Sequence, residues 1–159
     1  MSKDSQGFAL DFALPELSAT EALGARIAAA LRVGDLVALE GDLGAGKTTL
    51  ARAILASLGV TENVPSPTFT LVQEYETPRL TVRHFDLYRL EKPSEIAELG
   101  LDDALLDGAA LIEWPERAEG LLPDDRLQVA LSLDTGIRRA RLSGPMRWSE
   151  TLAETSNVG

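Results

Sequence analysis

The residues best suited to chemistry in this sequence lie in the segment GDLGAGKT, between Gly41 and Thr48. Its glycines let successive backbone N–H groups face one phosphate group, and a helix that begins directly after the loop adds the positive end of its dipole. Lys47 is placed to reach the β- and γ-phosphates, and the Thr48 hydroxyl is placed to ligate a Mg²⁺ ion that bridges them. The pattern therefore predicts a loop that binds the phosphates of a magnesium nucleotide. We expect the contacts to come from Asp42, Leu43, Gly44, Ala45, Gly46, Lys47, Thr48 and Thr49.

The sequence on either side of this loop has the character needed to position it. Residues 36–39 form a short apolar run that predicts a buried strand. After the loop, apolar residues recur at helical spacing and the pattern stops at Gly59, which predicts a helix. The alternative is a glycine-rich turn that joins a buried strand to a buried helix and binds nothing. The complete order of strand, loop and helix favours the phosphate-binding loop.

Two acidic residues follow predicted strands elsewhere in the chain. Asp86 ends the strand predicted for residues 80–85, and Glu113 directly follows the apolar run 109–112. The carboxyl ends of parallel strands meet at one edge of a sheet, which is also the edge that carries a phosphate-binding loop. Nucleotide hydrolysis needs a carboxylate near the metal and a group that orients the attacking water. We therefore expect Lys47, Asp86 and Glu113 to form the catalytic set; the alternative for each acid is an ordinary loop position.

Three further side chains carry weaker signals. Thr68, in the SPTF segment before a predicted strand, could place a hydroxyl over the γ-phosphate or belong to a plain proline turn. His84 is the only histidine and lies inside a strand pattern, where a packed side chain is more common than a catalytic base. Trp114 follows Glu113 directly and could pack against the metal site, present an aromatic surface to a partner or belong to the core.

No arginine has a spacing that marks it as the group that stabilises charge on a transferred phosphate. Arg83, Arg89 and Arg117 are candidates, and solvated surface positions are the more common interpretation of such residues. The sequence does not identify an adenine pocket either. The start of the first predicted helix, near residues 17–20, is a hypothesis for its place.

The whole pattern predicts an α/β fold of the P-loop NTPase type, with three α/β/α layers, a mostly parallel central sheet and an antiparallel hairpin extension. Strands are expected at residues 8–14, 36–39, 69–75, 80–85 and 109–112, and a closing hairpin at 126–134 and 138–142. A helix is expected from Ser18, with Glu21 completing a capping box, and two short helices separated by Gly100 are expected over residues 94–106.

Length and composition indicate one domain. The 159 residues can bury a core of their own, so we expect a single domain over residues 1–159, with its core at about 8–145 and a peripheral tail at 146–159. The formal net charge of −10 argues against a chain that holds nucleic acid by itself. The absence of cysteine removes disulfides and thiolate catalysis. Residues 1–7 lack the features of a signal peptide and no apolar run could span a membrane, so we expect a soluble, cytoplasmic protein.

Four segments together resemble the bacterial TsaE family, also called YjeE. They are GDLGAGKTT at 41–49, SPTF at 66–69, HFDLYRL at 84–90 and IEWPE at 112–116. The resemblance covers roughly residues 18 to 145. It implies an ATPase, with ATP or ADP and Mg²⁺ as ligands, that is required for the threonylcarbamoyl modification of adenosine 37 in tRNA. It also implies that the chain binds the TsaB and TsaD pair, in which TsaD carries the transfer chemistry, and meets tRNA only through that complex.

By the same resemblance, Lys47 contacts phosphate, Thr48 and Glu113 hold magnesium, Asp86 is needed for hydrolysis and Trp114 lies beside the nucleotide. The resemblance leaves open whether Asp86 touches the metal or the water. Two other functions remain compatible with the residues. One is a nucleotide-gated binding module in which hydrolysis is incidental. The other is a small-molecule kinase, for which the sequence offers neither an arginine-rich lid nor an acceptor pocket.

Overall fold

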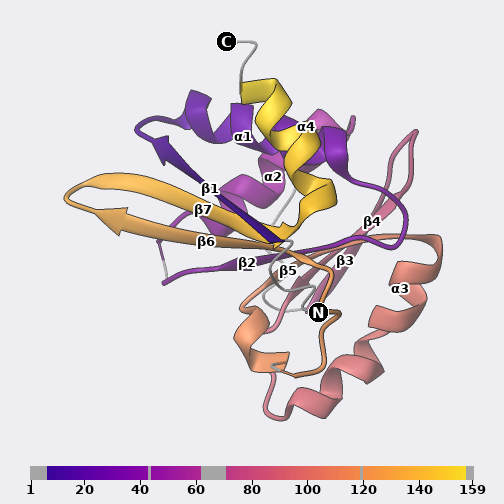
Figure 1. Ribbon diagram of the computed structural model, residues 1–159. Coiled ribbons are helices and arrows are strands. Elements are labelled where there is room, and N and C mark those ends of the chain that lie inside the picture. Colours follow the sequence, from indigo (N-terminus) through magenta and orange to yellow (C-terminus); the bar gives the residue numbers. More distant parts are fainter. Residues whose placement is uncertain (1–6, 43, 62–70, 119, 157–159) are drawn as a thin grey trace.

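The computed structural model describes residues 7–42, 44–61, 71–118 and 120–156, which contain a seven-stranded sheet (Figure 1). Its strands are β1 (Gly7–Leu14), β2 (Leu36–Glu40), β3 (Val72–Glu76), β4 (Thr81–Asp86), β5 (Gly108–Glu113), β6 (Leu127–Asp134) and β7 (Ile137–Pro145), in the spatial order β1-β7-β6-β2-β5-β4-β3. The four strands from β6 to β4 run parallel, whereas β3 pairs antiparallel at one edge, as do β7 and β1 at the other. The predicted α/β fold, with its mostly parallel centre and antiparallel hairpin extension, is confirmed.

Helices cover both faces of the sheet (Figure 1). α1 (Leu17–Ala30), α2 (Lys47–Ser57) and α4 (Met146–Ser156) lie on one face; η2 (Pro93–Leu99), α3 (Leu101–Asp107) and η3 (Pro115–Ala118), of which η2 and η3 are 3₁₀ helices, lie on the other. Side chains alternate along a strand, so β2 divides its apolar residues between the two layers. Val37 and Leu39 pack toward α1 and α2, while Leu36 and Ala38 pack toward α3. Both faces of β2 and β5 are therefore buried, as the continuous apolar runs predict.

The local predictions succeed for strand pairing and fail at one helix start. β3 and β4 pair antiparallel, and β6 and β7 form the closing hairpin, as expected. The capping box of Ser18 and Glu21 is wrong, because the N-cap is Glu16 and no side chain caps α1. The chain leaves β1 at Leu14 and turns directly into the helix, which places Ser18 inside the first turn. Of the strand predicted over residues 69–75, the first two residues lie outside the described part of the chain.

The segment after Met146 is not a peripheral tail. It forms α4, which packs against α1, β1 and β7. Trp148 and Leu152 stand one helical turn apart, and both are fully buried in the core that α1 and α2 share. The sequence-based prediction failed because only two large apolar side chains in this polar segment carry the packing. The core therefore continues beyond residue 145, to at least Leu152.

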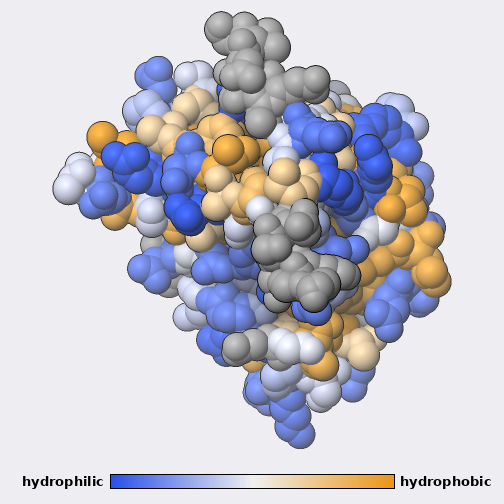
Figure 2. Space-filling view, viewed as in Figure 1, coloured by the Kyte–Doolittle hydropathy of each residue, from blue (hydrophilic) through white to orange (hydrophobic). Residues whose placement is uncertain are grey.

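Hydrophilic residues cover much of the face seen in Figure 2, with smaller hydrophobic areas between them. The large apolar side chains that stay exposed are scattered over different elements, among them Leu17, Leu106 and Leu133. Within the described residues, the helices are too short or too polar to cross a membrane.

Candidate functional site

The predicted phosphate-binding loop connects β2 to α2, and its backbone requires glycine. Gly41 has φ +148°, and a Cβ atom there would lie 2.6 Å from the Leu131 carbonyl oxygen on β6. No side chain fits at that distance. Gly46, the N-cap of α2, has φ +108°, a left-handed conformation that other residues adopt only with strain. The loop can therefore turn sharply between a buried strand and the first turn of a helix, with backbone N–H groups at the helix start free of helical partners.

Lys47 is almost fully buried, with 5% of its surface exposed, and lies across the loop. Its Nζ donates hydrogen bonds to the carbonyl oxygens of Gly41 at 2.5 Å and Asp42 at 3.0 Å. The same ammonium lies 4.2 Å from the centroid of the Trp114 ring. These contacts hold the positive charge at the loop, where a phosphate group would gain a charge-assisted hydrogen bond.

The two strand-end acids meet beside Thr48. β4 and β5 pair in parallel so that Asp86 is opposite Glu113, and both carboxylates are buried, with 5% and 3% of their surface exposed. Thr48 Oγ1 lies 2.9 and 3.0 Å from the two carboxylate oxygens of Glu113. Asp86 Oδ1 accepts a hydrogen bond from the Tyr88 backbone N–H at 3.0 Å. The edge shared by the parallel strands thus brings the acids to the start of α2.

His84 is fully buried, as a packed strand residue should be, but it also contacts this group. Its Nε2 lies 2.7 Å from Glu113 Oε2. The sequence missed this contact because His84 lies opposite Leu111 in the register, not opposite Glu113. The only sequence signal available was the two-residue spacing between His84 and Asp86, which places them on the same face of β4.

Trp114 adopts φ +62°, a left-handed backbone that a bulky residue adopts only under strain. Its backbone N–H donates to the Leu39 carbonyl oxygen at 3.3 Å, and its ring centroid lies 4.9 Å from that of Tyr88. The sequence left three interpretations of Trp114 open. In the structure its ring is half-buried and lies between Tyr88 and Lys47. The strained backbone aims the ring at the loop.

The arginine nearest the loop is one that sequence reasoning missed. Arg138, on β7, donates from its guanidinium to the Gly44 carbonyl oxygen at 3.3 Å. Arg83 instead bonds to Glu74 and Asp107, and Arg117 lies over the Tyr88 ring. No local pattern could have singled out Arg138, because 94 residues separate it from Gly44.

Two adjoining hollows surround the loop. The first is lined by Gly44, Gly46, Lys47, Thr48, Thr49, Asp86, Tyr88, Glu113, Trp114 and Arg138. The second is lined by Leu14, Glu16, Leu17, Thr20, Ala45, Gly46, Thr49, Leu131 and Arg138. Gly46, Thr49 and Arg138 border both. The first hollow therefore contains Lys47 and both strand-end acids, and the second extends from it to the start of α1, the region that the sequence suggested for a base.

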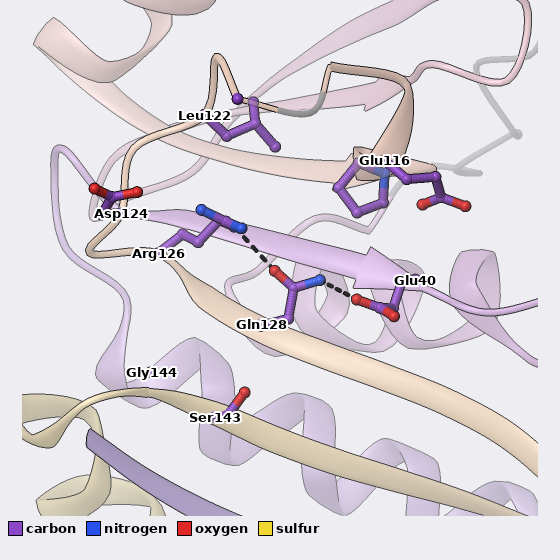
Figure 3. A pocket seen from close by; sticks show the side chains of 10 residues that line it. Glu40, Glu116, Leu122, Asp124, Arg126, Gln128, Ser143 and Gly144 are labelled. Atoms are coloured by element: carbon purple, nitrogen blue, oxygen red, sulfur yellow. Dashed lines mark hydrogen bonds between the residues drawn. The ribbon is translucent and has the colours of Figure 1, made fainter. Parts of the chain in front are cut away.

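A wider hollow, of about 920 Å³ against 410 Å³ for the first hollow at the loop, lies elsewhere (Figure 3). On its floor, Arg126 donates to the Gln128 side chain at 2.9 Å, and Gln128 donates to the Glu40 carboxylate. These polar groups satisfy one another, and the hollow lacks Lys47 and the strand-end acids. We therefore place the candidate site at the loop and not in this wider hollow.

The oxygen donors beside the loop fit a magnesium ion. Mg²⁺ binds hydroxyl and carboxylate oxygens, keeps several waters, and completes its shell with substrate phosphates. The Thr48 hydroxyl and the Glu113 carboxylate are already in contact. Among the described residues, groups of three or more acidic or histidine side chains suited to a metal are absent. Leu43 and Thr68, two residues of interest from the sequence, lie outside the described residues.

A buried strand, a glycine loop with Lys47 and Thr48 at the start of a helix, and an acid on the neighbouring parallel strand define the P-loop class of nucleotide-binding proteins. A more specific assignment follows from comparison with known families. The model of the family described as threonylcarbamoyl adenosine biosynthesis protein TsaE matches residues 14–141. The chain belongs to the TsaE family.

Individual relatives agree with this assignment. The chain is 48% identical over 107 residues to the tRNA threonylcarbamoyladenosine biosynthesis protein TsaE of Rickettsia bellii, covering 67% of this chain and 74% of the relative. It is 40% identical over 136 residues to TsaE of Nostoc sp., covering 82% and 83%. The crystal structure of YdiB from Bacillus subtilis superposes with a TM-score of 0.78 at 32% identity, covering 94% of each chain.

Proposed function

We propose that this chain is the ATP-binding and ATP-hydrolysing component of the machinery that makes threonylcarbamoyladenosine in tRNA, and that it does not transfer the threonylcarbamoyl group itself. The observation that carries the ATPase proposal is the single hollow lined by Lys47, Thr48, Asp86 and Glu113. Membership of the TsaE family supports the assignment to tRNA modification.

The loop residues would bind the nucleotide. Backbone N–H groups of residues 42–49, in the loop and the first turn of α2, would face the phosphates. Lys47 would exchange its bonds to Gly41 and Asp42 for bonds to phosphate oxygens. Trp114 would lie beside the nucleotide and flank the same ammonium. Arg138 borders both hollows, so its guanidinium would meet the nucleotide between the phosphates and the base.

The buried acids would serve hydrolysis. Thr48 and Glu113 would hold Mg²⁺, which when bound neutralises charge on the phosphate oxygens. Glu113 and Asp86 lie opposite each other at the strand ends, so one carboxylate can serve the metal and its waters while the other orients the attacking water. This division of roles assigns Asp86 to the water, because Thr48 contacts Glu113.

The adenine base would occupy the second hollow. Leu14, Leu17 and Leu131 supply apolar surface there, and Thr20 supplies a hydroxyl. A flat heterocycle is suited to an apolar slot with a few polar groups that fix its orientation.

The partners would be the TsaB and TsaD proteins in the cytoplasm, as the family resemblance implies. The net charge of −10 favours contact with proteins over direct contact with tRNA, since phosphate backbones require clustered cations. ATP turnover would then act on the partner complex, and tRNA would be held by that complex.

The test is steady-state ATP hydrolysis by the purified chain, alone and with the TsaB–TsaD pair, with Lys47→Ala as the control. We expect the pair to stimulate hydrolysis and the Lys47→Ala variant to lose both basal and stimulated turnover. Tight ATP binding without hydrolysis in any mixture would reject the ATPase and favour a nucleotide-gated binding module. Absence of ATP binding would reject the nucleotide site itself.

A further inference from the structure

We propose that His84 is a positioning residue for Glu113: its Nε2–H donates a hydrogen bond to Glu113 Oε2 and keeps the carboxylate aimed at Thr48. This inference rests on the proposed nucleotide function and extends it to a side chain that touches neither nucleotide nor metal. The contact is short, at 2.7 Å, and both side chains are buried.

The arrangement of β4 and β5 makes this contact possible. In their parallel register His84 lies opposite Leu111, and Asp86 lies opposite Glu113. Alternate residues of a strand point to the same face, so His84 and Glu113 share the face that carries α2. His84 reaches Glu113 diagonally from the side away from the loop, while Thr48 reaches it from the loop side.

The direction of the hydrogen bond follows from the chemistry of the two groups. An ionised carboxylate only accepts hydrogen bonds, so the proton of the contact belongs to His84 Nε2. In the neutral ring the other nitrogen, Nδ1, is then a bare acceptor, and among the described residues it has no hydrogen-bond partner. Of the two tautomers, the one with its proton on Nδ1 would leave a buried N–H without an acceptor and no proton for the contact with Glu113, which favours the proton on Nε2.

The bond from His84 comes from a side chain that would not itself bind the metal. In the structure Glu113 accepts bonds from two side chains, Thr48 and His84. Thr48 would itself be a metal ligand, so His84 is the one of these two donors that orients the carboxylate without touching the metal. Removing a donor that hydrogen-bonds to a metal ligand without touching the metal typically lowers metal affinity or activity by roughly 10- to 100-fold.

The first experiment measures nucleotide binding as a function of Mg²⁺ concentration in His84→Met and His84→Gln, beside Val82→Ala. Methionine fills the space without a donor, glutamine restores an N–H at the same reach, and Val82 is a buried neighbour on the same face of β4. We expect His84→Met to raise the Mg²⁺ concentration for half-maximal ATP binding about 10-fold. ADP binding without Mg²⁺ should stay unchanged, and His84→Gln and Val82→Ala should keep the wild-type Mg²⁺ dependence.

Wild-type Mg²⁺ dependence in His84→Met would overturn the proposal, as would equal effects of the methionine and glutamine variants. A purely structural role would weaken ADP binding with and without Mg²⁺ alike. In a Glu113→Gln background, His84→Met should add nothing to the change in Mg²⁺ dependence, because the carboxylate that it positions is gone.

A second experiment needs no variant that might fail to fold. His84 is the only histidine, so a long-range ¹H–¹⁵N spectrum of the untagged, nucleotide-free protein reports this ring alone. We expect a protonated Nε2 and an unprotonated Nδ1, with both signals shifted in Glu113→Gln. An Nδ1–H tautomer would reject the positioning role of His84 and leave the proposed nucleotide function standing. A wild-type protein without Mg²⁺-dependent nucleotide binding would instead reject the proposed function.

Discussion

Thr48 Oγ1 lies within 3.0 Å of both carboxylate oxygens of Glu113, although 65 residues separate them in the chain. The first belongs to the helix that leaves the loop and the second ends the neighbouring parallel strand. The contact joins a hydroxyl to a carboxylate at the loop, the two groups that we propose would hold Mg²⁺. Four predictions follow from this site and from the fold that supports it.

Glu113→Gln should retain nucleotide binding and lose hydrolysis. The amide keeps the size of the side chain and removes the negative charge, so ADP binding without Mg²⁺ should stay near wild type. The hydrolysis rate should fall by about 100-fold or more, because the metal that Glu113 would hold supplies several kcal/mol of charge stabilisation in the transition state. Single-turnover hydrolysis and calorimetric ADP binding check this. Glu116→Gln, on η3 and exposed, is the matched control and should behave as wild type. Wild-type turnover in Glu113→Gln would remove Glu113 from the mechanism.

Arg138→Gln should weaken ATP binding about 2- to 5-fold, corresponding to about 0.5–1 kcal/mol for an exposed charge pair. The effect should shrink at high salt, because such pairs are screened. Arg139→Gln is the matched control: Arg139 is the next residue, lies 3.9 Å from Asp134, and does not line either hollow at the loop. Binding isotherms at two salt concentrations check this. An equal effect of both substitutions would show that only net charge matters.

Trp148→Ala should destabilise the protein by about 3–5 kcal/mol, the usual cost of truncating a large buried aromatic side chain. Trp148 is fully buried between α4 and the core of α1 and α2. Urea unfolding followed by circular dichroism measures the change. Met146→Ala, two residues earlier with 47% of its surface exposed, should change the free energy of unfolding by no more than about 0.5 kcal/mol. A small effect of Trp148→Ala would mean that α4 detaches readily from α1.

The pH dependence of stability should carry a contribution from Asp35. Burial raises the pKa of this carboxyl above 3.8, although the Arg32 backbone N–H and the Arg147 charge act in the opposite direction. The folded state therefore binds the proton more tightly than the unfolded state, and the stabilisation is complete below pH 3.8 and lost as the pH rises through the folded-state pKa.

The variant Asp35→Asn, which cannot titrate, isolates that contribution. The free energy of unfolding of the wild type, minus that of Asp35→Asn, should decrease as the pH rises from 3.8 toward neutrality. Urea titrations at a series of pH values measure the difference. A difference that grows with pH would mean that the ion pair with Arg147 outweighs the effect of burial.

Much of the site could be predicted because its signals are local. The glycines and Lys47 belong to one short loop motif. Glu113 follows an apolar run that predicts a buried parallel strand. The family assignment is confirmed on the same motifs. The errors occur where a residue's role depends on distant neighbours. Ser18 has the sequence pattern of a helix cap, but the turn out of β1 makes Glu16 the N-cap and starts the helix at Leu17.

The sequence by itself determined the class of loop, the mostly parallel sheet whose strands carry the acids, and the family. These depend on residue type, short-range spacing and the alternation of buried faces, which act within one element. Only the tertiary structure decided that His84 bonds to Glu113, that Arg138 covers the loop, and that Trp148 completes the core. The physical reason is register and packing: these contacts join residues from different elements, and no local preference specifies which side chains of two elements meet.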